Sequence, residues 1–310
     1  MAESQLQKDW KHLRYTFRII AHHPLTRHKA LPALKRWLLW QIGSRLVPGP
    51  VAVPFVNHTR LLVGPRMHGA TLNVYVGLDE FEDMSFLLHF LRPQDLFVDV
   101  GAAVGAYTVL AAGAIGASAM AFEPTPEAFH ALRANVNLNG FGDRAACYPL
   151  AVGREVGTAQ FTTGLGTLNH IVPQAERLES GHTEIEMTTL DGELAAGEPA
   201  LIKIDVEGFE QAVLGGAEAT LGRSSLGAMI IEIGKGCKKY GTTPAQTFDR
   251  VTGYGFTACR YEPVGRHLTE VTREAWTESR GTNTIFCRDV EVCRDRVGSA
   301  PAFRVIGREI

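Results

Sequence analysis

Two glycines and several carboxylates in this sequence directly follow apolar runs, where a folded chain can place them at the edge of a sheet. In the stretch 97–108 an apolar run contains Asp99 and is followed by Gly101 and Gly105. Glycines at such a turn let the backbone approach a ligand closely, and a helix beginning there offers unpaired N–H groups. The stretch therefore predicts a small-molecule site, in competition with a turn that only packs a helix on a strand.

The spacing of small residues in this turn bears on the class of ligand. The dinucleotide fingerprint G-x-G-x-x-G would place its second and third glycines at Ala103 and Ala106, which weakens the case for a pyrophosphate. No G-K-S or G-K-T follows, and this excludes a phosphate-binding P-loop. A glycine-poor turn suits a ligand without a pyrophosphate, such as S-adenosylmethionine, whose ammonium group Asp99 could bind directly or through water.

A second acidic residue follows the next apolar run. Residues 118–122 lead into Glu123 and Pro124. A carboxylate at the tip of this strand is placed to accept hydrogen bonds from both ribose hydroxyls of an adenosine. A carboxylate at Glu123 fits a nicotinamide cofactor and S-adenosylmethionine alike. The prediction of a cofactor site is stronger because Glu123 and Asp99 occupy corresponding positions at the ends of consecutive strands.

The stretch 201–210 reads L-I-K-I-D-V-E-G-F-E and places Asp205, Glu207 and Glu210 behind a third apolar strand. Ligands bind at the carboxyl edge of open α/β sheets, and acids beside a buried strand are costly unless they meet a cation, a donor or a metal. We expect Asp205 and Glu207 to act as a base or to orient the substrate. Glu232 would join them from the next strand, whereas Glu210 has the pattern of a solvated helix position.

If the ligand is S-adenosylmethionine, an alcohol acceptor must lose a proton, so a base or a metal is expected. Asp205 and Glu232 could hold Mg²⁺, which prefers carboxylate oxygens, but we assign no metal site. His170, in the polar stretch 164–183, is a further candidate catalytic residue, in competition with a surface role.

Taken together, these motifs resemble the FkbM family of methyltransferases. The likeness runs from D-V-G-x-x-x-G-x-Y-T through F-E-P-x-P and L-x-x-N to I-K-I-D-V-E-G-F-E, over roughly 95–290. The family's usual Asn in the first loop is Ala103 here. The resemblance implies the class I methyltransferase fold, a doubly wound, Rossmann-like α/β sheet of seven strands in the order 3-2-1-4-5-7-6 with the last strand antiparallel. It also implies O-methylation of a sugar, a glycolipid or a natural product.

By position, the resemblance assigns cofactor contacts to residues of the first two motifs, and the chain after the third strand would approach the adenine. The expected set is Asp99, Gly101, Ala103, Gly105, Tyr107, Thr108, Glu123, Pro124, Ala151 and Asp205.

Three other functions remain open on the same fold. A nicotinamide-dependent oxidoreductase predicts the full set of loop glycines and a Tyr-x-x-x-Lys or comparable pair, and neither is present. A nucleic-acid methyltransferase commonly carries an N/D-P-P-Y/F block that holds a flipped base, which this sequence lacks. A non-catalytic nucleotide-binding module is disfavoured by the acids Asp99, Glu123 and Asp205.

The elements that would position these residues alternate between strand and helix from residue 96 onward. Continuous apolar strands separated by helices favour a parallel sheet covered on both faces. We expect its strands at 96–100, 118–122, 145–149, 200–206, 227–233, 256–260 and 284–287, and helices at 102–114, 125–140, 209–221 and from 243. A β insertion would pair 158–163 with 184–189, and β-like runs at 51–56, 60–63 and 71–76 precede a helix at 80–91.

The charge of the chain is unevenly distributed. We divide it into a basic helical and β extension at 1–66, a methyltransferase domain at 67–290 and a C-terminal tail at 291–310. The extension has eleven Lys and Arg and two acids, hence +9, whereas the whole chain carries −2. This predicts a contact with an anionic membrane or a phosphate, or a helical face docked on the acidic body. The helical pattern at 31–46 would suit a membrane surface, packing on the catalytic domain or a homodimer.

The composition, with 45% hydrophobic and 21% charged residues, is that of an ordinary globular protein and names no function. Five cysteines without a C-x-x-C pair, no visible signal peptide and no spanning apolar run predict a cytoplasmic protein, with peripheral membrane contact open. The expected acceptor is a small molecule, a saccharide or a glycolipid, and nucleic acid is not expected.

Overall fold

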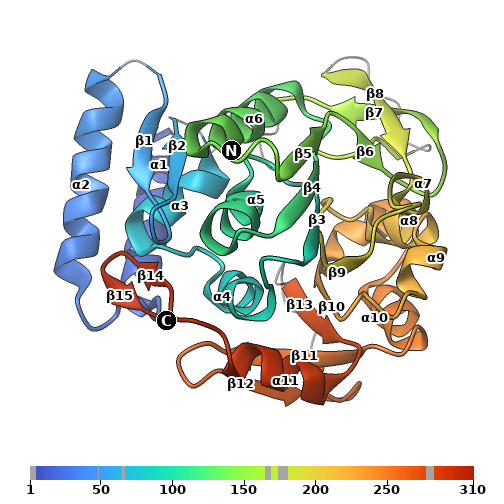
Figure 1. Ribbon diagram of the computed structural model, residues 1–310. Coiled ribbons are helices and arrows are strands. Elements are labelled where there is room, and N and C mark those ends of the chain that lie inside the picture. The colour runs from blue at the N-terminus through green and yellow to red at the C-terminus, as the bar shows by residue number, and fades with distance from the viewer. Residues whose placement is uncertain (1–4, 48, 65–66, 165–168, 174–180, 277–282) are drawn as a thin grey trace.

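A mixed eight-stranded sheet forms the centre of the molecule (Figure 1). The computed structural model describes residues 5–47, 49–64, 67–164, 169–173, 181–276 and 283–310. The strand order is β12-β11-β13-β10-β9-β3-β4-β5. The strands are β3 (Leu96–Val100), β4 (Ser118–Phe122), β5 (Ala145–Tyr148), β9 (Pro199–Ile204), β10 (Ala228–Glu232), β11 (Thr257–Glu262), β12 (His267–Glu270) and β13 (Asn283–Cys287).

The topology of this sheet confirms the expected order 3-2-1-4-5-7-6. β5, β4, β3, β9 and β10 run parallel, and β13 lies antiparallel between β10 and β11. β12 adds an eighth strand at the edge, paired antiparallel with β11. The chain order reverses between β3 and β9, and this is the point at which open α/β sheets bind ligands.

The central strands are apolar on both faces because helices cover both sides of the sheet. Every residue of β9 is buried, and successive side chains enter different cores: Leu201 packs on one face and Ile202 on the other. α4 (Phe81–Phe90), α5 (Ala106–Val109) and α6 (Pro126–Asn139) cover one face. α8 (Glu210–Gly215), α9 (Glu218–Leu221) and α10 (Pro244–Gly253) cover the other (Figure 1).

The strand expected at 71–76 is wrong, because this segment belongs to helix α3 (His68–Val76). Its β-branched and aromatic residues favour a strand locally, but Tyr75 and Val76 pack against Ile20 and Ala33 of the two preceding helices. Tertiary packing therefore overrides the local preference.

Two expected helices are shorter than the sequence predicts. The helix expected from 102 begins at α5, since the preceding loop passes through Gly105 with φ +84°, and it continues as a π-helical turn over Leu110–Ile115. The helix expected over 209–221 is interrupted between α8 and α9 at Gly216. A Cβ at Gly216 would lie 2.0 Å from the carbonyl oxygen of Gly153, so the chain is packed too closely there for a regular helix.

The N-terminal extension consists of α1 (Gln5–His22), α2 (Ala30–Leu46) and a hairpin of β1 (Val51–Pro54) and β2 (Arg60–Val63). The amide nitrogen of Leu62 donates to Oδ1 of Asn135 at 2.6 Å, and that of Arg60 donates to Oδ1 of Asn139 at 2.8 Å. These bonds tie the hairpin to α6 on the central sheet. Among the described residues, no helix is long and apolar enough to cross a membrane.

The expected pairing of 158–163 with 184–189 is confirmed by β7 (Gly157–Thr162) and β8 (His182–Thr188), which run antiparallel. With β6 (Ala151–Val152) they form a small sheet in the order β6-β8-β7. α7 (Leu190–Glu193) leads from this insertion back toward β9.

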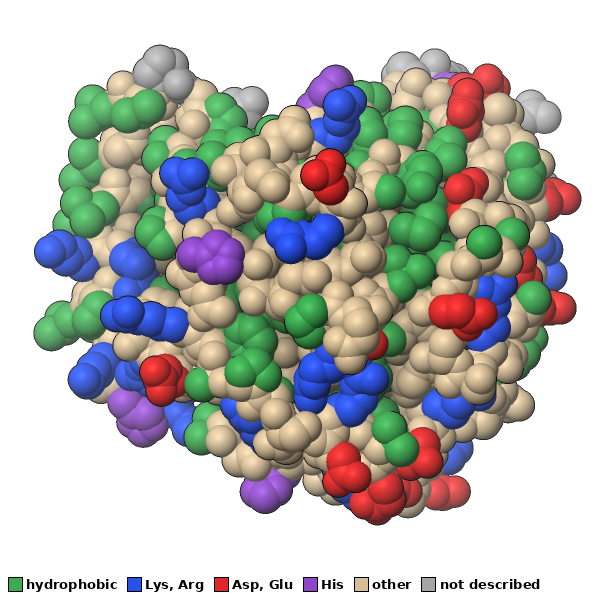
Figure 2. Space-filling view, in the orientation of Figure 1, with side chains coloured by type: hydrophobic (Ala, Val, Ile, Leu, Met, Phe, Trp, Pro, Cys, Tyr) green, Lys and Arg blue, Asp and Glu red, His purple; other side chains and the backbone are tan. Residues whose placement is uncertain are grey.

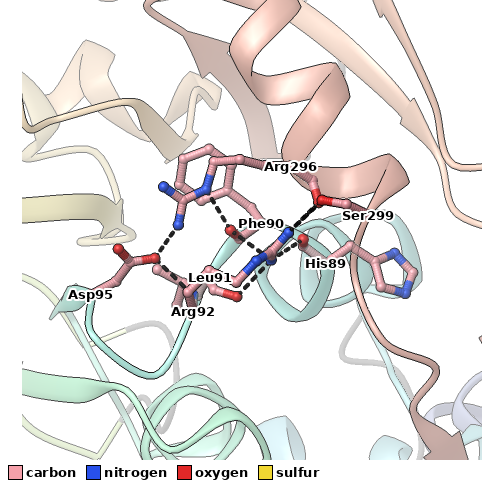
Figure 3. A network of polar contacts seen from close by, with 7 residues as sticks. All are labelled: His89, Phe90, Leu91, Arg92, Asp95, Arg296 and Ser299. Carbon is pink, nitrogen blue, oxygen red and sulfur yellow. Dashed lines mark hydrogen bonds and ion pairs between the residues drawn. The ribbon is translucent and has the colours of Figure 1, made fainter.

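The segment expected to be a tail instead forms helix α11 (Val290–Gly298) and a hairpin of β14 (Arg304–Val305) and β15 (Arg308–Glu309). Two arginines fix α11 to the turn before β3 (Figure 3). Arg296 donates to the Phe90 carbonyl at 2.8 Å and pairs with Asp95, while Arg92 donates to Oγ of Ser299 at 3.1 Å. The two arginines thereby donate hydrogen bonds to backbone carbonyls at the C-terminal end of α4, which have no partner within the helix. The same contacts fix the position of the turn that leads into β3.

Candidate functional site

A cavity of about 1070 Å³ opens at the carboxyl edge of the sheet, where the chain order reverses. Its base is formed by the loops after β3, β4 and β9, and its walls include Tyr15 of α1, Tyr75 of α3, and Phe161 and Thr183 of the β insertion. A cavity of this size is large enough for a cofactor and a small acceptor together.

The loop after β3 is shaped by close backbone contacts. Gly101 has φ +80°, and a Cβ there would lie 1.9 Å from the carbonyl oxygen of Asp205, so only glycine fits. Gly105 precedes α5, and a Cβ there would lie 2.4 Å from Cδ1 of Leu132. These glycines join the first motif to the third and to α6, and they bring the loop backbone to the cavity.

Glu123 holds this loop from the end of β4. Its Oε2 accepts from the amide of Ala103 at 2.9 Å and its Oε1 from the amide of Thr125 at 2.8 Å. Burial raises the pKa of Glu123, and the backbone donors act against that rise. Each carboxylate oxygen can accept a second hydrogen bond, which leaves Glu123 able to bind hydroxyls in the cavity.

Asp99 is buried at the end of β3 and accepts from Oγ1 of Thr108 at 2.7 Å. Burial raises its pKa, while Lys203 and Thr108 act in the opposite direction. Of the expected cofactor residues, Gly105 and Thr108 lie behind the wall, where they position the loop and Asp99. The cavity is lined by the other eight: Asp99, Gly101, Ala103, Tyr107, Glu123, Pro124, Ala151 and Asp205.

A buried lysine, which sequence reasoning did not single out, lies among these acids. Nζ of Lys203 is 2.7 Å from Oδ2 of Asp205 and 4.7 Å from the ring centre of Tyr107. Burial alone would lower the pKa of Lys203, but the charges of Asp205, Glu80 and Asp99 raise it. Burial likewise opposes ionisation of Asp205, and the Lys203 ammonium overcomes this and lowers the pKa of Asp205. A charged residue inside an otherwise apolar strand was the available sequence signal.

Glu80 also enters the site, from outside the stretch that resembles the family. It accepts from the Tyr107 hydroxyl at 2.7 Å through Oε2 and from Nδ2 of Asn283 at 2.9 Å through Oε1. Asn283 also donates to Oδ2 of Asp83 at 3.2 Å. The N-terminal end of α4 is thus linked to β13 and, through Tyr107 of α5, to the helix that follows the β3 loop.

The expected catalytic carboxylates come together: Asp205, Glu207 and Glu232 each place one oxygen within 4.8 Å of the others. Burial and the charge of Asp205 raise the pKa of Glu207 to about 7 and also raise that of Glu232. Glu207 has φ +55°, an uncommon conformation for a residue other than glycine. Such strain clusters at functional sites.

Asp205 and Glu232, the pair that we expect could hold Mg²⁺, both belong to this trio. Carboxylate oxygens suit a hard cation. Asp205 also pairs with the Lys203 ammonium, which supplies positive charge beside these carboxylates.

Two expectations for the surroundings need correction. Glu210 is buried, not solvated, and its Oε1 accepts from the amide of Gly208 at 2.9 Å, which stabilises the turn after Glu207. His170 is buried beside β7, with its amide donating to Oγ1 of Thr162 at 2.9 Å. Its neighbours Asn169 and Ile171 line the cavity and His170 does not, so its placement does not support a catalytic role. Parts of the expected wall at 164–183, namely 165–168 and 174–180, lie outside the described residues.

The cavity is strongly acidic. Among the residues that the structure describes, its lining has one basic side chain, Lys203, and eight carboxylates. The carboxylates are Asp79, Glu80, Asp99, Glu123, Glu127, Asp205, Glu207 and Glu232. Such a lining favours a cationic ligand and opposes the two negative charges of a dinucleotide pyrophosphate.

Comparison with known families matches residues 99–256, about half of the chain, to the methyltransferase FkbM domain. Comparison with curated proteins found no match. Among solved structures, the chain is similar to a precorrin-6y C5,15-methyltransferase from Geobacter metallireducens, with TM-score 0.40 and 10% identity over 68% of this chain and 88% of that one. It is also similar to an rRNA methylase from Streptococcus thermophilus, with TM-score 0.39 and 14% identity over 66% of this chain and 91% of that one. Both likenesses are distant, and the fold assignment rests on the strand order of this chain.

Proposed function

Because the chain belongs to the FkbM methyltransferase family, we propose that it transfers the methyl group of S-adenosylmethionine to a hydroxyl oxygen of a sugar, a glycolipid or another natural product. The observation that carries this proposal is the acidic cavity at the reversal point of the sheet, where eight carboxylates surround one lysine. This lining complements a ligand with a sulfonium and an ammonium group. It also provides several acceptors for the hydroxyl groups of an acceptor molecule.

The residues present fit S-adenosylmethionine. Glu123, at the tip of β4, would accept the ribose hydroxyls, and Ala151 would border the adenine. Asp99 lies on β3, and Asp205 directly follows the adjacent strand β9. Both line the cavity and would bind the ammonium end and balance the sulfonium charge. When bound, S-adenosylmethionine supplies a methyl group on a positively charged sulfur that leaves as a neutral thioether.

The chain itself must align the acceptor and take its proton. Alignment supplies much of the rate in such a displacement, and the walls from α1, α3 and the β insertion would provide it. Glu207, with a pKa raised to about 7, is matched to accept the hydroxyl proton as the new oxygen–carbon bond forms. Glu232, whose pKa burial and the charge of Asp205 raise to about 9, would keep its own proton beside Glu207 and could donate a hydrogen bond in the cavity. Lys203 keeps Asp205 ionised throughout.

Isothermal titration with S-adenosylhomocysteine tests the cofactor assignment, with NAD as the competing ligand. We expect micromolar binding of S-adenosylhomocysteine and none of NAD. Glu123→Ala should weaken binding by about 10- to 100-fold, because hydrogen bonds to a charged group contribute about 1.5–3 kcal/mol each. Glu155→Ala, at an exposed turn, is the matched control and should bind as the wild type does.

Because Glu123 also accepts from the amides of Ala103 and Thr125, a thermal melt must show that Glu123→Ala is folded. Glu123→Gln is a milder second variant, since its side-chain oxygen can still accept from one of these amides. Preference for NAD, or no binding of S-adenosylhomocysteine by the folded wild type, would overturn the proposal. Incubation with isotope-labelled S-adenosylmethionine and a panel of sugars, glycolipids and phenols would then identify the acceptor. Glu207→Gln should abolish label transfer while leaving S-adenosylhomocysteine affinity unchanged.

A further inference from the structure

Helix α2 has an unusual surface. Five large apolar side chains, at 51–80% exposure, point away from the body: Leu31, Leu38, Leu39, Ile42 and Leu46. We call these residues, with Lys35 and Arg45 between them, the outer face of α2. Isolated exposed apolar residues are normal in globular proteins, but a row of them along one helix marks a contact surface.

The opposite side of α2 is already used for packing. Ala33 is fully buried there, and Trp37 and Trp40 pack against the cluster formed with α1 and α3. A helix packed on one side is expected to be polar on the other, whereas α2 is apolar on both sides. Packing on the body of the protein therefore accounts for only one side of α2, and the outer face requires an apolar partner of its own.

The surroundings of the outer face are basic. Lys35 and Arg45 lie on it, and Arg14, Arg18, Arg27 and Lys29 are exposed on α1 and on the turn between the two helices. Residues 1–66 carry eleven basic and two acidic side chains. Figure 2 shows hydrophobic and basic side chains side by side along the edge that α2 occupies in Figure 1.

A second cavity continues this apolar surface inward. A groove of about 480 Å³ lies between α2 and β1, and it is lined almost entirely by apolar side chains, including Trp40, Val53 and Phe55. Leu39 belongs both to the groove and to the outer face, so the two are continuous. Arg36, the charged residue of the lining, is held by the Tyr75 carbonyl at 2.6 Å.

We propose that the outer face of α2 and this groove dock on the surface of an anionic phospholipid bilayer. The leucines and Ile42 enter the boundary between headgroups and acyl chains, and the basic residues meet the phosphates, as in helices that lie in the plane of a membrane. A symmetric dimer through the same face would instead oppose two strongly basic segments. Charge therefore favours the bilayer over a second copy of the chain.

The inner side of α2 connects the outer face to the catalytic cavity. Tyr75 packs in the same cluster as the inner side of α2, and it lines the cavity together with Tyr15 and Thr16 of α1. Docking would hold the enzyme at the bilayer, which favours an acceptor hydroxyl on a lipid-linked saccharide or glycolipid. This last step rests on the proposed function, whereas docking itself does not.

Sedimentation of the full-length protein with vesicles tests the docking. Vesicles of equal parts phosphatidylcholine and phosphatidylglycerol should pellet the protein, and vesicles of phosphatidylcholine alone should not. The double variant Leu38→Glu/Ile42→Glu should lose binding by at least about tenfold, because it places charge at two inserted positions. Lys35→Glu/Arg45→Glu should lose about fivefold or more for each reversed residue. Val264→Glu, at a residue 76% exposed on the turn before β12, is the matched control and should bind normally.

Equal binding to neutral vesicles, or retention of binding by Leu38→Glu/Ile42→Glu, would overturn the proposal. The proposal would also be overturned if light scattering showed a concentration-dependent dimer that Leu38→Glu/Ile42→Glu abolishes, because the outer face would then bind a second copy of the chain. Inorganic phosphate that replaces chloride at constant ionic strength should not release the protein, since release under these conditions would identify a free-phosphate site instead of a bilayer. Titration with S-adenosylhomocysteine, run in parallel on each variant, separates a failure of docking from a failure of the methyltransferase assignment.

Discussion

Replacement of Lys203 by Met should reveal how strongly the buried ion pair holds the site. Lys203 is 4% exposed and its partner Asp205 is 27% exposed, at an N–O distance of 2.7 Å. Removing one member of a buried pair costs about 3–5 kcal/mol, because it leaves the other charge uncompensated. The partial exposure of Asp205 places the expected loss near the lower end, about 3 kcal/mol. For a chain of this size, that loss lowers the melting temperature by about 6–12 °C.

An exposed pair with the same geometry provides the control. Arg273 and Asp249 also lie 2.7 Å apart, but their side chains are 45% and 60% exposed. Exposed pairs contribute about 0–1 kcal/mol. Arg273 also lies over two aromatic rings, so the clean comparison is between the coupling energies of two double-mutant cycles. The cycle of Lys203→Met with Asp205→Asn should give about 2 kcal/mol or more. The cycle of Arg273→Met with Asp249→Asn should give no measurable coupling, because solvent screens an exposed pair.

Urea unfolding followed by circular dichroism measures both cycles at pH 7. The pKa of Lys203 is raised, so its contribution persists until the pH exceeds the ordinary value for lysine. The pKa of Asp205 is lowered, so its contribution persists until the pH falls below the ordinary value for aspartate. The coupling should therefore be level between about pH 5 and pH 9. Equal coupling energies for the buried and exposed pairs would refute the argument that burial determines the strength of this contact.

Other predictions concern the loop and the pH dependence. Gly101→Ala should destabilise by more than about 4 kcal/mol and abolish S-adenosylhomocysteine binding, because its Cβ would lie 1.9 Å from the Asp205 carbonyl oxygen. Gly255→Ala is the control, because Gly255 has φ +85° but a Cβ there would meet no atom within 4 Å, and it should lower stability by only about 1–2 kcal/mol in thermal melts. Equal losses of stability in Gly101→Ala and Gly255→Ala would contradict this prediction. Burial and the charge of Glu80 raise the pKa of Asp83 to about 7, so stability is lost as the pH rises through about 4 to 7. The variant Asp83→Asn should therefore be more stable than the wild type by about 4 kcal/mol at pH 8, and this gain should fade below pH 5 in urea unfolding. A gain that did not change with pH would show that Asp83 is ionised throughout and would refute the prediction.

Part of the fold could be predicted to the residue. The strands Leu96–Val100 and Ser118–Phe122 match the expected bounds, because Gly or an acid follows each apolar run. Helix α6 lies one residue inside the expected range 125–140 at each end. Thr125 and Pro126 mark the start of α6, and Gly140, with φ +69°, marks its end. These signals are local, so they can be read without knowledge of the tertiary structure.

The carboxylates of the cavity could be predicted only in part. Asp99, Glu123 and Asp205 follow the strands of one sheet edge, and parallel topology brings them together. Glu80 and Asn283 are separated by about two hundred residues in sequence, yet they meet beside Tyr107. No periodicity relates α4 to β13, and their contact depends on the packing of the complete sheet. The same limit explains α3, which is helical only because α1 and α2 cover it.

Ala103 shows how a departure from a family motif can be absorbed by the backbone. The residue has φ +49°, a left-handed conformation that Asn tolerates better than Ala, and this accounts for the preference for Asn at such a position. In this chain the contact that the loop makes at this position is a hydrogen bond from the Ala103 amide to Glu123, which any residue except proline supplies. The substitution therefore removes a side chain from the cavity wall and adds local strain while the loop keeps its course. We therefore expect any ligand at this part of the cavity to meet the Ala103 backbone instead of an Asn side chain, and its binding to depend on Glu123 and Asp99.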